Sequence, residues 1–203
     1  RAAAGEPPSR DPTPTARDYF FDGSIGVLQN YNNSKVWIYP SMRRGGRMIY
    51  GLDVTNPDNP TLKWGKGCPN QSSDAGCDTD YDGIGQTWSW PSVAYIKGHS
   101  ATAPVIITGG GYDTCEDADN ASPSCGSAKG RGVYIIDANN GNVIANLPTT
   151  RGVPADIALV DIDYDGYVDY AYAADTGGNI WRVSFIDYAH NKAPLSSANR
   201  TIT

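Results

Sequence analysis

The chain has 203 residues and a formal net charge of −6 at pH 7. An acidic chain whose largest basic cluster is Arg43, Arg44 and Arg47 is not expected to bind nucleic acid. No apolar run approaches the roughly 18 residues of a membrane span, and no signal peptide opens the chain. We therefore predict no direct membrane span and interpret the sequence as a fragment or a processed product. The 23 Gly, 14 Pro and 13 Tyr favour many short strands and turns, and so an all-β fold.

Residues 1–17 are rich in proline and nearly free of large apolar side chains, which is typical of a linker or an extended arm. The composition then changes, and residues 18–203 are predicted to form one domain. Its first part contains four strand-like runs separated by turn residues, namely 23–29, 35–39, 47–54 and 61–64. Four strands in about 45 residues are typical of one blade of a β-propeller.

The third of these runs recurs, which supports a repeat architecture. Residues 49–57 (Ile-Tyr-Gly-Leu-Asp-Val-Thr-Asn-Pro) return as residues 133–141 and more loosely as residues 180–187. In the first two copies the strand ends in a turn whose backbone amides Asp53 and Asp137 can bind. Three copies predict about three blade-like units, fewer than the roughly four to eight of a closed propeller. We therefore expect a partial, modified β-propeller whose open edges are covered by further chain or by a partner.

Four cysteines form two close pairs, Cys68/Cys77 and Cys115/Cys125, each of which brackets a polar insert. These gaps do not match the spacing of zinc knuckles, and His99 and His190 are the only histidines. We predict a local disulfide within each pair and an oxidising compartment. Free buried thiols are the alternative.

Residues 85–96 and 103–112 are predicted to be inner strands of the second blade. The second run ends in Gly109–Gly111, and three consecutive glycines invite comparison with phosphate-binding loops. No helix is predicted after them whose N-terminus could hold a phosphate. A close approach of strands near the propeller axis, or a bulge, is therefore the favoured explanation.

Alternating aspartates occur twice, and the first series is the weaker one. Asp78, Asp80 and Asp82 match positions 1, 3 and 5 of a calcium loop and Gly83 matches position 6, but Gln86 stands at position 9. A side-chain amide can still coordinate calcium, although more weakly. Two interpretations stay open: a second ion site, and a polar turn held by the neighbouring disulfide.

The second series, residues 161–169 (Asp-Ile-Asp-Tyr-Asp-Gly-Tyr-Val-Asp), is the strongest site pattern in the chain. Ca²⁺ takes about six to eight oxygen ligands, and carboxylates at positions 1, 3, 5 and 9 with a main-chain carbonyl at position 7 can wrap around it. The flanking runs 157–160 and 168–174 are strand-like, so the loop is expected to close a β-hairpin. The predicted ligands are Asp161, Asp163, Asp165, Asp169 and the carbonyl of Tyr167. A solvated, Asp-rich turn is the alternative interpretation.

Several motifs together resemble a known family. They are residues 19–24 (Tyr-Phe-Phe-Asp-Gly-Ser), 44–57, 87–94 (Thr-Trp-Ser-Trp-Pro-Ser-Val-Ala), 110–112, 133–141, 161–169 and 173–183. Over residues 19–187 the chain is similar to the C-terminal propeller of the PilY1/PilC family of type IV pilus tip-associated adhesins. The resemblance implies a modified β-propeller at the bacterial surface or pilus tip, associated with the outer membrane. It also implies a role in pilus assembly, surface attachment and twitching motility, with pilins or minor pilins and a host or surface receptor as partners. Calcium in the loop of residues 161–169 would oppose pilus retraction.

Two other classes of function stay open. An integrin-like or carbohydrate-binding propeller would carry calcium hairpins in several blades, whereas only one strong pattern is present here. A quinoprotein dehydrogenase also repeats a Tyr-x-Leu-Asp-x-x-x-Gly turn, but the tryptophan expected after the glycine is missing from the copy at residues 133–141, and the chain has no Cys-Cys pair. Since His99 and His190 lie outside any catalytic motif, we predict that the chain is not an enzyme.

Overall fold

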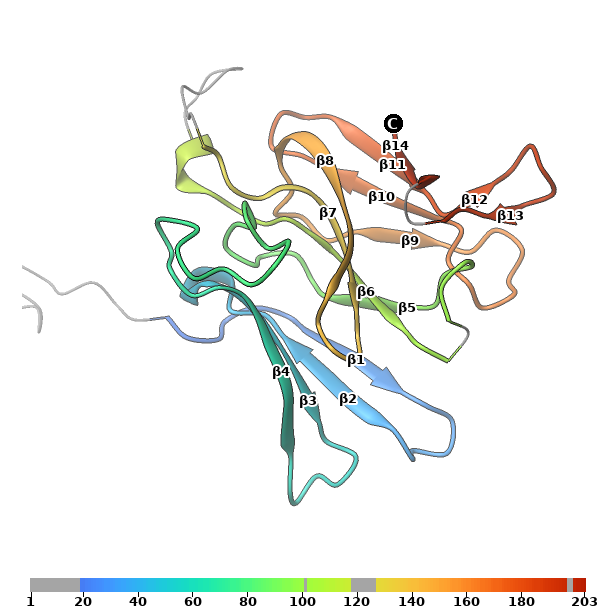
Figure 1. Ribbon diagram of the computed structural model, residues 1–203, viewed down its shortest axis with the longest axis horizontal. Coiled ribbons are helices and arrows are strands. Elements are labelled where there is room, and N and C mark those ends of the chain that lie inside the picture. Colours follow the sequence, from blue (N-terminus) through green and yellow to red (C-terminus); the bar gives the residue numbers. More distant parts are fainter. Residues whose placement is uncertain (1–18, 101, 118–126, 197–198) are drawn as a thin grey trace, which may run out of the picture.

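The structure, a computed structural model, describes residues 19–100, 102–117, 127–196 and 199–203. The predicted linker, residues 1–17, lies outside the described residues. The strands of the described part form three four-stranded antiparallel sheets and one two-stranded ribbon, so the all-β prediction is confirmed (Figure 1). None of the helices in these ranges is long and apolar enough to cross a membrane.

The first sheet contains four strands that follow one another both in the chain and in space. They are β1 (Ile25–Gln29), β2 (Val36–Pro40), β3 (Arg47–Asp53) and β4 (Thr61–Cys68), and the short 3-10 helix η1 (Arg43–Gly45) separates β2 from β3. All four predicted strands are present, but the fourth is longer than the predicted run of residues 61–64. It continues because β3 offers backbone partners as far as Arg47, which lies opposite Cys68.

The second sheet has the same order. It contains β5 (Ser92–Ala94), β6 (Val105–Gly109), β7 (Arg131–Asp137) and β8 (Val143–Gly152), with the 3-10 helix η2 (Thr114–Glu116) between β6 and β7. The predicted strand over residues 85–96 is wrong for most of its length. Pro91 has no N–H group to donate to a ladder, and the residues before it turn towards the glycine segment, where Gly85 N donates to Gly110 O at 2.8 Å.

The third sheet contains β9 (Ala158–Val160), β10 (Tyr170–Ala174), β11 (Ile180–Ser184) and β14 (Thr201–Ile202), and β12 (Ile186–Asp187) forms a ribbon with β13 (Ala193–Pro194). The three predicted copies of the repeat coincide with β3, β7 and β11, which are the third strands of their sheets. The predicted turn contacts are also present. Asp53 accepts from Thr55 N at 2.9 Å, and Asp137 accepts from Asn139 N at 2.7 Å.

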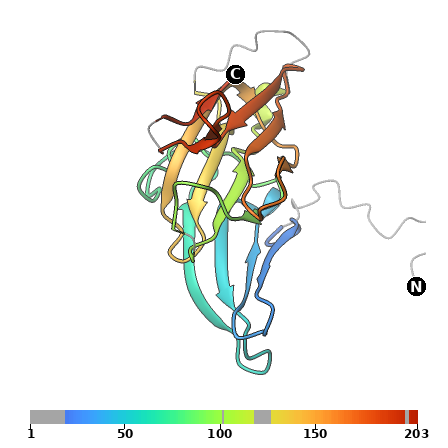
Figure 2. The same cartoon turned by 90° about the vertical axis from the view of Figure 1, so that its right-hand side faces the viewer.

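The core lies in two layers, one on each side of the second sheet. Alternate residues of a strand point to opposite faces, so Ile107 and Ile135 pack towards the third sheet while Ile106 and Ile136 pack towards the first. All four side chains are fully buried. The three sheets therefore follow one another through the molecule like successive propeller blades, without closing into a ring in the described part (Figures 1 and 2).

The three glycines Gly109–Gly111, of which the first ends β6, lie where backbone segments approach one another closely. A Cβ on Gly111, whose φ is +107°, would meet Gln86 O at 2.1 Å, and Gly110 N donates to Gly132 O at 2.8 Å. The helix that follows, η2, has three residues, and it leaves no N-terminus long enough to hold a phosphate. The structure thus supplies a packing reason for the glycines, as the sequence favoured.

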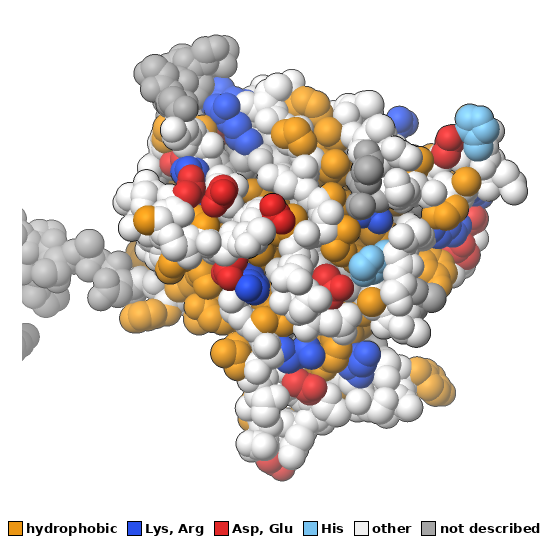
Figure 3. All heavy atoms as spheres, viewed as in Figure 1, with side chains coloured by type: hydrophobic (Ala, Val, Ile, Leu, Met, Phe, Trp, Pro, Cys, Tyr) orange, Lys and Arg blue, Asp and Glu red, His pale blue; other side chains and the backbone are white. Residues whose placement is uncertain are grey.

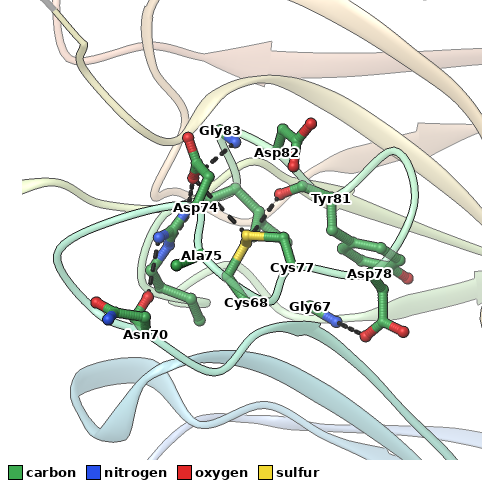
Figure 4. The surroundings of a disulfide bond; sticks show 12 residues. Gly67, Cys68, Asn70, Asp74, Ala75, Cys77, Asp78, Tyr81, Asp82 and Gly83 are labelled. Atoms are coloured by element: carbon green, nitrogen blue, oxygen red, sulfur yellow. Dashed lines mark hydrogen bonds and ion pairs between the residues drawn. A yellow bond between two sulfur atoms is a disulfide. The ribbon is translucent and has the colours of Figure 1, made fainter.

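The first cysteine insert is closed by the predicted disulfide, Cys68–Cys77, with a Cα–Cα distance of 4.1 Å (Figure 4). Cys125 lies outside the described residues, so the predicted Cys115–Cys125 bond stays a prediction. The closed insert folds over the start of β3, and its turns are held by short-range bonds such as that from Ser72 N to Asn70 Oδ1 at 2.8 Å.

Arg47 of the basic Arg43, Arg44, Arg47 cluster is a buried structural residue and not a solvated one. Its side chain is 1% exposed and lies inside the disulfide-closed insert. The guanidinium donates to the carbonyl oxygens of residues 70, 73 and 84 at 2.6–2.9 Å and to Asp74 Oδ1 at 2.7 Å. Arg44 pairs with Asp22 at the surface. Arg47 is therefore a structural group of the insert, and Arg44 has a surface partner of its own.

Candidate metal centre

The Asp-rich loop of residues 161–169 joins β9 to β10, as predicted. The two strands pair antiparallel with Tyr170 opposite Val160, and Asp169 N donates to Val160 O at 2.9 Å, which fixes the base of the hairpin. The reversal uses left-handed backbone at Gly166, with a φ of +88°, and at Tyr164, with a φ of +59°. Nothing lies within 4 Å of a Cβ placed on Gly166, so its requirement for glycine is conformational and not steric.

The carboxylates of the loop converge on one region. Ligand oxygens of Asp161, Asp163 and Asp169 all lie within 4.8 Å of one another. The carboxylate of Asp165 reaches the same region, because one ammonium group, that of Lys97, lies 2.7 Å from Asp165 Oδ2 and 3.6 Å from Asp163 Oδ2. The structure therefore brings three of the four selected aspartates within reach of one ion, and Asp165 is linked to them through Lys97.

Backbone amides of the loop hold several of these carboxylates in place. Asp161 accepts from Tyr164 N at 2.7 Å through one oxygen and from Gly166 N at 2.9 Å through the other. Asp165 Oδ1 accepts from Tyr167 N at 3.0 Å. Tyr167 itself is half-buried, and the ligand role of its carbonyl stays a prediction. Hydrogen bonds within the loop thus organise it without a bound cation.

Asp169 gives the strongest test of whether a cation fits. Its side chain is fully buried; Oδ2 accepts from Ile162 N at 2.9 Å, whereas Oδ1 has no hydrogen-bond partner. A buried carboxylate oxygen without a hydrogen bond is costly, and the nearest cationic group, Lys97 Nζ, lies 3.8 Å away. A hard divalent cation would supply the missing interaction, and carboxylate oxygens are the ligands that Ca²⁺ prefers. The residues present therefore fit calcium.

The first series of aspartates does not form a comparable group. Asp78 pairs with Lys66 Nζ at 2.7 Å and accepts from Gly67 N at 3.1 Å. Among the described residues, Asp78, Asp80 and Asp82 are not brought together as a set of metal-ligating oxygens. This arrangement agrees with the polar turn beside the Cys68–Cys77 disulfide, the second of the two interpretations.

Two lysines that the sequence did not select face the loop. Lys97 comes from the connection between β5 and β6, and Lys192 Nζ lies 3.1 Å from Asp163 Oδ2. A hydrogen bond to Asp165 raises the pKa of Lys97, and the Lys192 hydrogen bond lowers the pKa of Asp163. No local spacing rule could have found either lysine, because both lie far from the loop in sequence.

Lys97 reaches the loop through a backbone contact between the second and third sheets. Ile96 forms a parallel bridge with Val168, and Val168 N donates to Tyr95 O at 2.8 Å. Figure 1 shows the result, with the orange loop after β9 lying beside the green connection that follows β5. The candidate metal centre therefore lies at the junction of two blades and not on an isolated hairpin.

The histidines do not assemble a catalytic group. His190 contacts Asp187 at 2.7 Å on the exposed ribbon, and His99 lies 3.8 Å from Asp137. In the described part of the chain, no hydrogen bond joins either ring to a serine hydroxyl.

Acidic and basic side chains are interspersed on the face drawn in Figure 3, which shows no large basic patch.

The sequence model of the family described as "PilY1 beta-propeller domain" matches residues 10–202. The chain belongs to the PilY1 β-propeller family. A type IV pilus biogenesis factor PilY1 of Pseudomonas aeruginosa strain UCBPP-PA14 is 33% identical over 189 residues, which cover 91% of this chain and 13% of that protein. A PilY1 homolog of Xylella fastidiosa is 27% identical over 183 residues, covering 89% of this chain and 13% of that protein.

A solved structure supports the same PilY1 assignment. The crystal structure of the Pseudomonas aeruginosa PilY1 C-terminal domain matches with a TM-score of 0.63 and 27% identity, over 90% of this chain and 36% of that one. The fold is therefore that of a part of the PilY1 C-terminal propeller. Because the chain spans about an eighth of the curated relatives it matches, the activities of the whole PilY1 proteins are not carried over directly.

Proposed function

We propose that this chain is a calcium-binding module of a type IV pilus biogenesis factor. It acts outside the cell, at the bacterial surface or pilus tip and associated with the outer membrane, where it contacts pilins or minor pilins and a host or surface receptor. It supports pilus assembly, surface attachment and twitching motility, and calcium in the loop modulates pilus retraction. Membership of the PilY1 family and the description of the relatives as type IV pilus biogenesis factors support the pilus part of this proposal.

The observation that carries the calcium part is Asp169 Oδ1, which is buried without a hydrogen bond beside the carboxylates of Asp161 and Asp163. A solvated surface turn, the alternative interpretation, would leave its carboxylates to water. Here one carboxylate is fully buried, and oxygens of Asp161 and Asp163 lie within 4.8 Å of it. The cost of that arrangement is offset if a cation binds.

The positions of the loop's residues determine which part of the loop calcium binding would order. Asp169 directly precedes β10 and is hydrogen-bonded to Val160 of β9. Val168 is hydrogen-bonded to Tyr95 in the second blade, so the base of the loop is anchored. Asp163 and Asp165 lie on the exposed tip. Calcium would supply a divalent charge that offsets part of the repulsion among the loop's carboxylates, so its binding would fix the tip to the anchored base.

The integrin-like alternative has less support. It expects calcium hairpins in several blades, and within the described ranges the other group of potential metal ligands is Cys68, Asp74 and Cys77. Two of those three residues form a disulfide, so that group is not a metal site.

The pilus part is tested by Asp163→Ala in the intact protein, expressed in the bacterium that encodes it. Asp163 is exposed, so the substitution should leave folding and secretion unchanged while removing a ligand. We expect altered pilus number or twitching at a calcium concentration that saturates the wild-type protein. Asp82→Ala, in the first aspartate series, is the matched control, because Asp82 is also exposed, and it should behave as wild type. Unchanged pili and twitching in an Asp163→Ala strain that no longer binds calcium would contradict the proposed function.

A further inference from the structure

The ammonium group of Lys97 is centred among the acidic groups of the candidate metal centre. Its Nζ lies 2.7 Å from Asp165 Oδ2, 3.6 Å from Asp163 Oδ2 and 3.8 Å from Asp169 Oδ1. These oxygens belong to three of the five predicted calcium ligands. The last of them is the buried oxygen that no hydrogen bond satisfies.

From this geometry we infer that Lys97 is an internal counter-ion of the calcium loop and that calcium binds by exchange with its ammonium group. The inference rests on the proposed calcium site. A calcium ion and an ammonium group cannot bind the same oxygens at the same time, since both are positively charged and repel each other at such short distances. Lys97 therefore stabilises the loop without calcium and weakens calcium binding. Both effects express the same coupling free energy between the ammonium group and the ion.

The position of Lys97 is built into the fold. The neighbouring residue, Ile96, bridges Val168 next to Asp169, and this bridge fixes the backbone of Lys97 beside the loop. A lysine side chain has a long, flexible stem, so its ammonium group can leave the carboxylates while the bridge remains. Calcium would then change which groups the second blade presents at its junction with the third, without separating the two blades.

Lys192 does not share this role. It contacts Asp163 alone, at 3.1 Å, and the described ion pairs give it no contact with Asp165 or Asp169. Its side chain is also more exposed, at 35% against 21% for Lys97. Water screens an exposed pair of this kind strongly, so Lys192 should affect calcium affinity less than Lys97.

The test compares wild type with Lys97→Gln, Lys97→Arg and Lys66→Gln in the whole chain. Lys66 is the matched control, because its Nζ also lies 2.7 Å from an aspartate oxygen, that of Asp78 in the other series. Calorimetric titration gives the calcium dissociation constant, and thermal melting in a chelator gives the stability without calcium. We expect Lys97→Gln to bind calcium more tightly, on the order of tenfold, and to melt at a lower temperature in chelator. Lys97→Arg keeps the charge and should retain weak binding, and Lys66→Gln should leave calcium affinity unchanged.

The outcomes separate the two proposals. Equal or weaker calcium binding by Lys97→Gln, with binding retained in wild type, would overturn the exchange and leave the calcium site standing. If none of the four proteins binds calcium, the site itself is wrong and the exchange falls with it. Tighter binding by Lys97→Arg as well would show that charge is not the cause, and would also overturn the exchange.

Discussion

Arg47 is the residue on which the first insert depends most. It lies at the start of β3, and the disulfide-closed loop folds over it so that one guanidinium binds three main-chain carbonyls and Asp74. A planar guanidinium with several fixed donors suits this task, which a lysine could not perform with the same geometry. The same hydrogen bond from Arg47 lowers the pKa of Asp74.

Arg47→Met should destabilise the fold by about 3–5 kcal/mol, because it removes one partner of a buried network and leaves carbonyl groups and a carboxylate unpaired. Arg44→Met is the matched control. It breaks an exposed pair with Asp22 and should cost less than about 1 kcal/mol. Urea unfolding of both variants measures the difference, and equal small losses would show that the Arg47 network contributes little.

The pKa of Asp74 predicts that the stability of the fold depends on pH. The hydrogen bond from Arg47, followed by that from Lys129, lowers the pKa of Asp74 to about 2, below its unfolded value near 3.8. A carboxyl group with a lowered folded-state pKa stabilises the fold above its unfolded pKa and loses that contribution as pH falls towards the folded value. Stability should therefore decline between about pH 4 and pH 2, and Asp74→Asn should show a shallower decline in urea unfolding over this range. Parallel curves for the two proteins would contradict the assignment.

At the scale of the element, the inserts are structural connectors between blades. Glu116 of η2 accepts from Arg131 Nε at 2.8 Å, from Gly152 N at 2.6 Å and from Thr176 Oγ1 at 2.8 Å. These three partners come from β7, the end of β8 and the turn before β11. One buried carboxylate thus joins the second insert to two sheets. The chain has two glutamates in all, and no sequence pattern predicts this role for Glu116.

The disulfides should be local. Peptide mapping without reduction is expected to find Cys68 linked to Cys77 and Cys115 linked to Cys125. Replacing Cys68 and Cys77 together by alanine should cost about 2–3 kcal/mol, the entropic effect of opening a loop of this size in the unfolded chain. A cross-linked peptide joining Cys68 to Cys125 would refute local pairing and the account of the inserts.

The elements that could be predicted from the sequence are those with local signals. The strands of the first blade and the Asp161–Asp169 hairpin depend on residues a few positions apart, and the structure has both. Residues 85–96 were mispredicted because an apolar, aromatic run predicts a strand even where its backbone groups form hydrogen bonds outside a β-ladder. Arg47 and Lys97 could not be placed, since their environments depend on Asp74 and on the Ile96–Val168 bridge, which are long-range contacts.

At the scale of the whole molecule, the first sheet leaves one face without a neighbour in the described part. An apolar depression on that face is lined by residues of β1, β2, β3 and β4 and by Phe21. Ile25 is 49% exposed and Leu62 is 65% exposed, whereas both faces of the second sheet are covered. Contiguous exposed apolar surface of this kind promotes association.

The isolated chain of residues 1–203 should therefore self-associate, and Leu62→Lys should reduce that association by placing a charge on the apolar face. Analytical ultracentrifugation over a range of protein concentrations measures it. Lys63→Gln, which changes a charge on the neighbouring residue without altering the apolar surface, is the control. A monomer at all concentrations with a cooperative melt would show that the face needs no cover.

The most direct test of the account is a calcium titration of wild type and Asp163→Ala, by calorimetry and by thermal melting. Asp163 is the better choice of ligand, because removing Asp169 would also leave Ile162 N unpaired. Wild type should bind one Ca²⁺ in preference to Mg²⁺ and gain about 2.7 kcal/mol of stability at a hundred times the dissociation constant. Asp163→Ala should fold in chelator as wild type does and lose that gain. Equal responses in the two proteins, or no response in either, would contradict the calcium site.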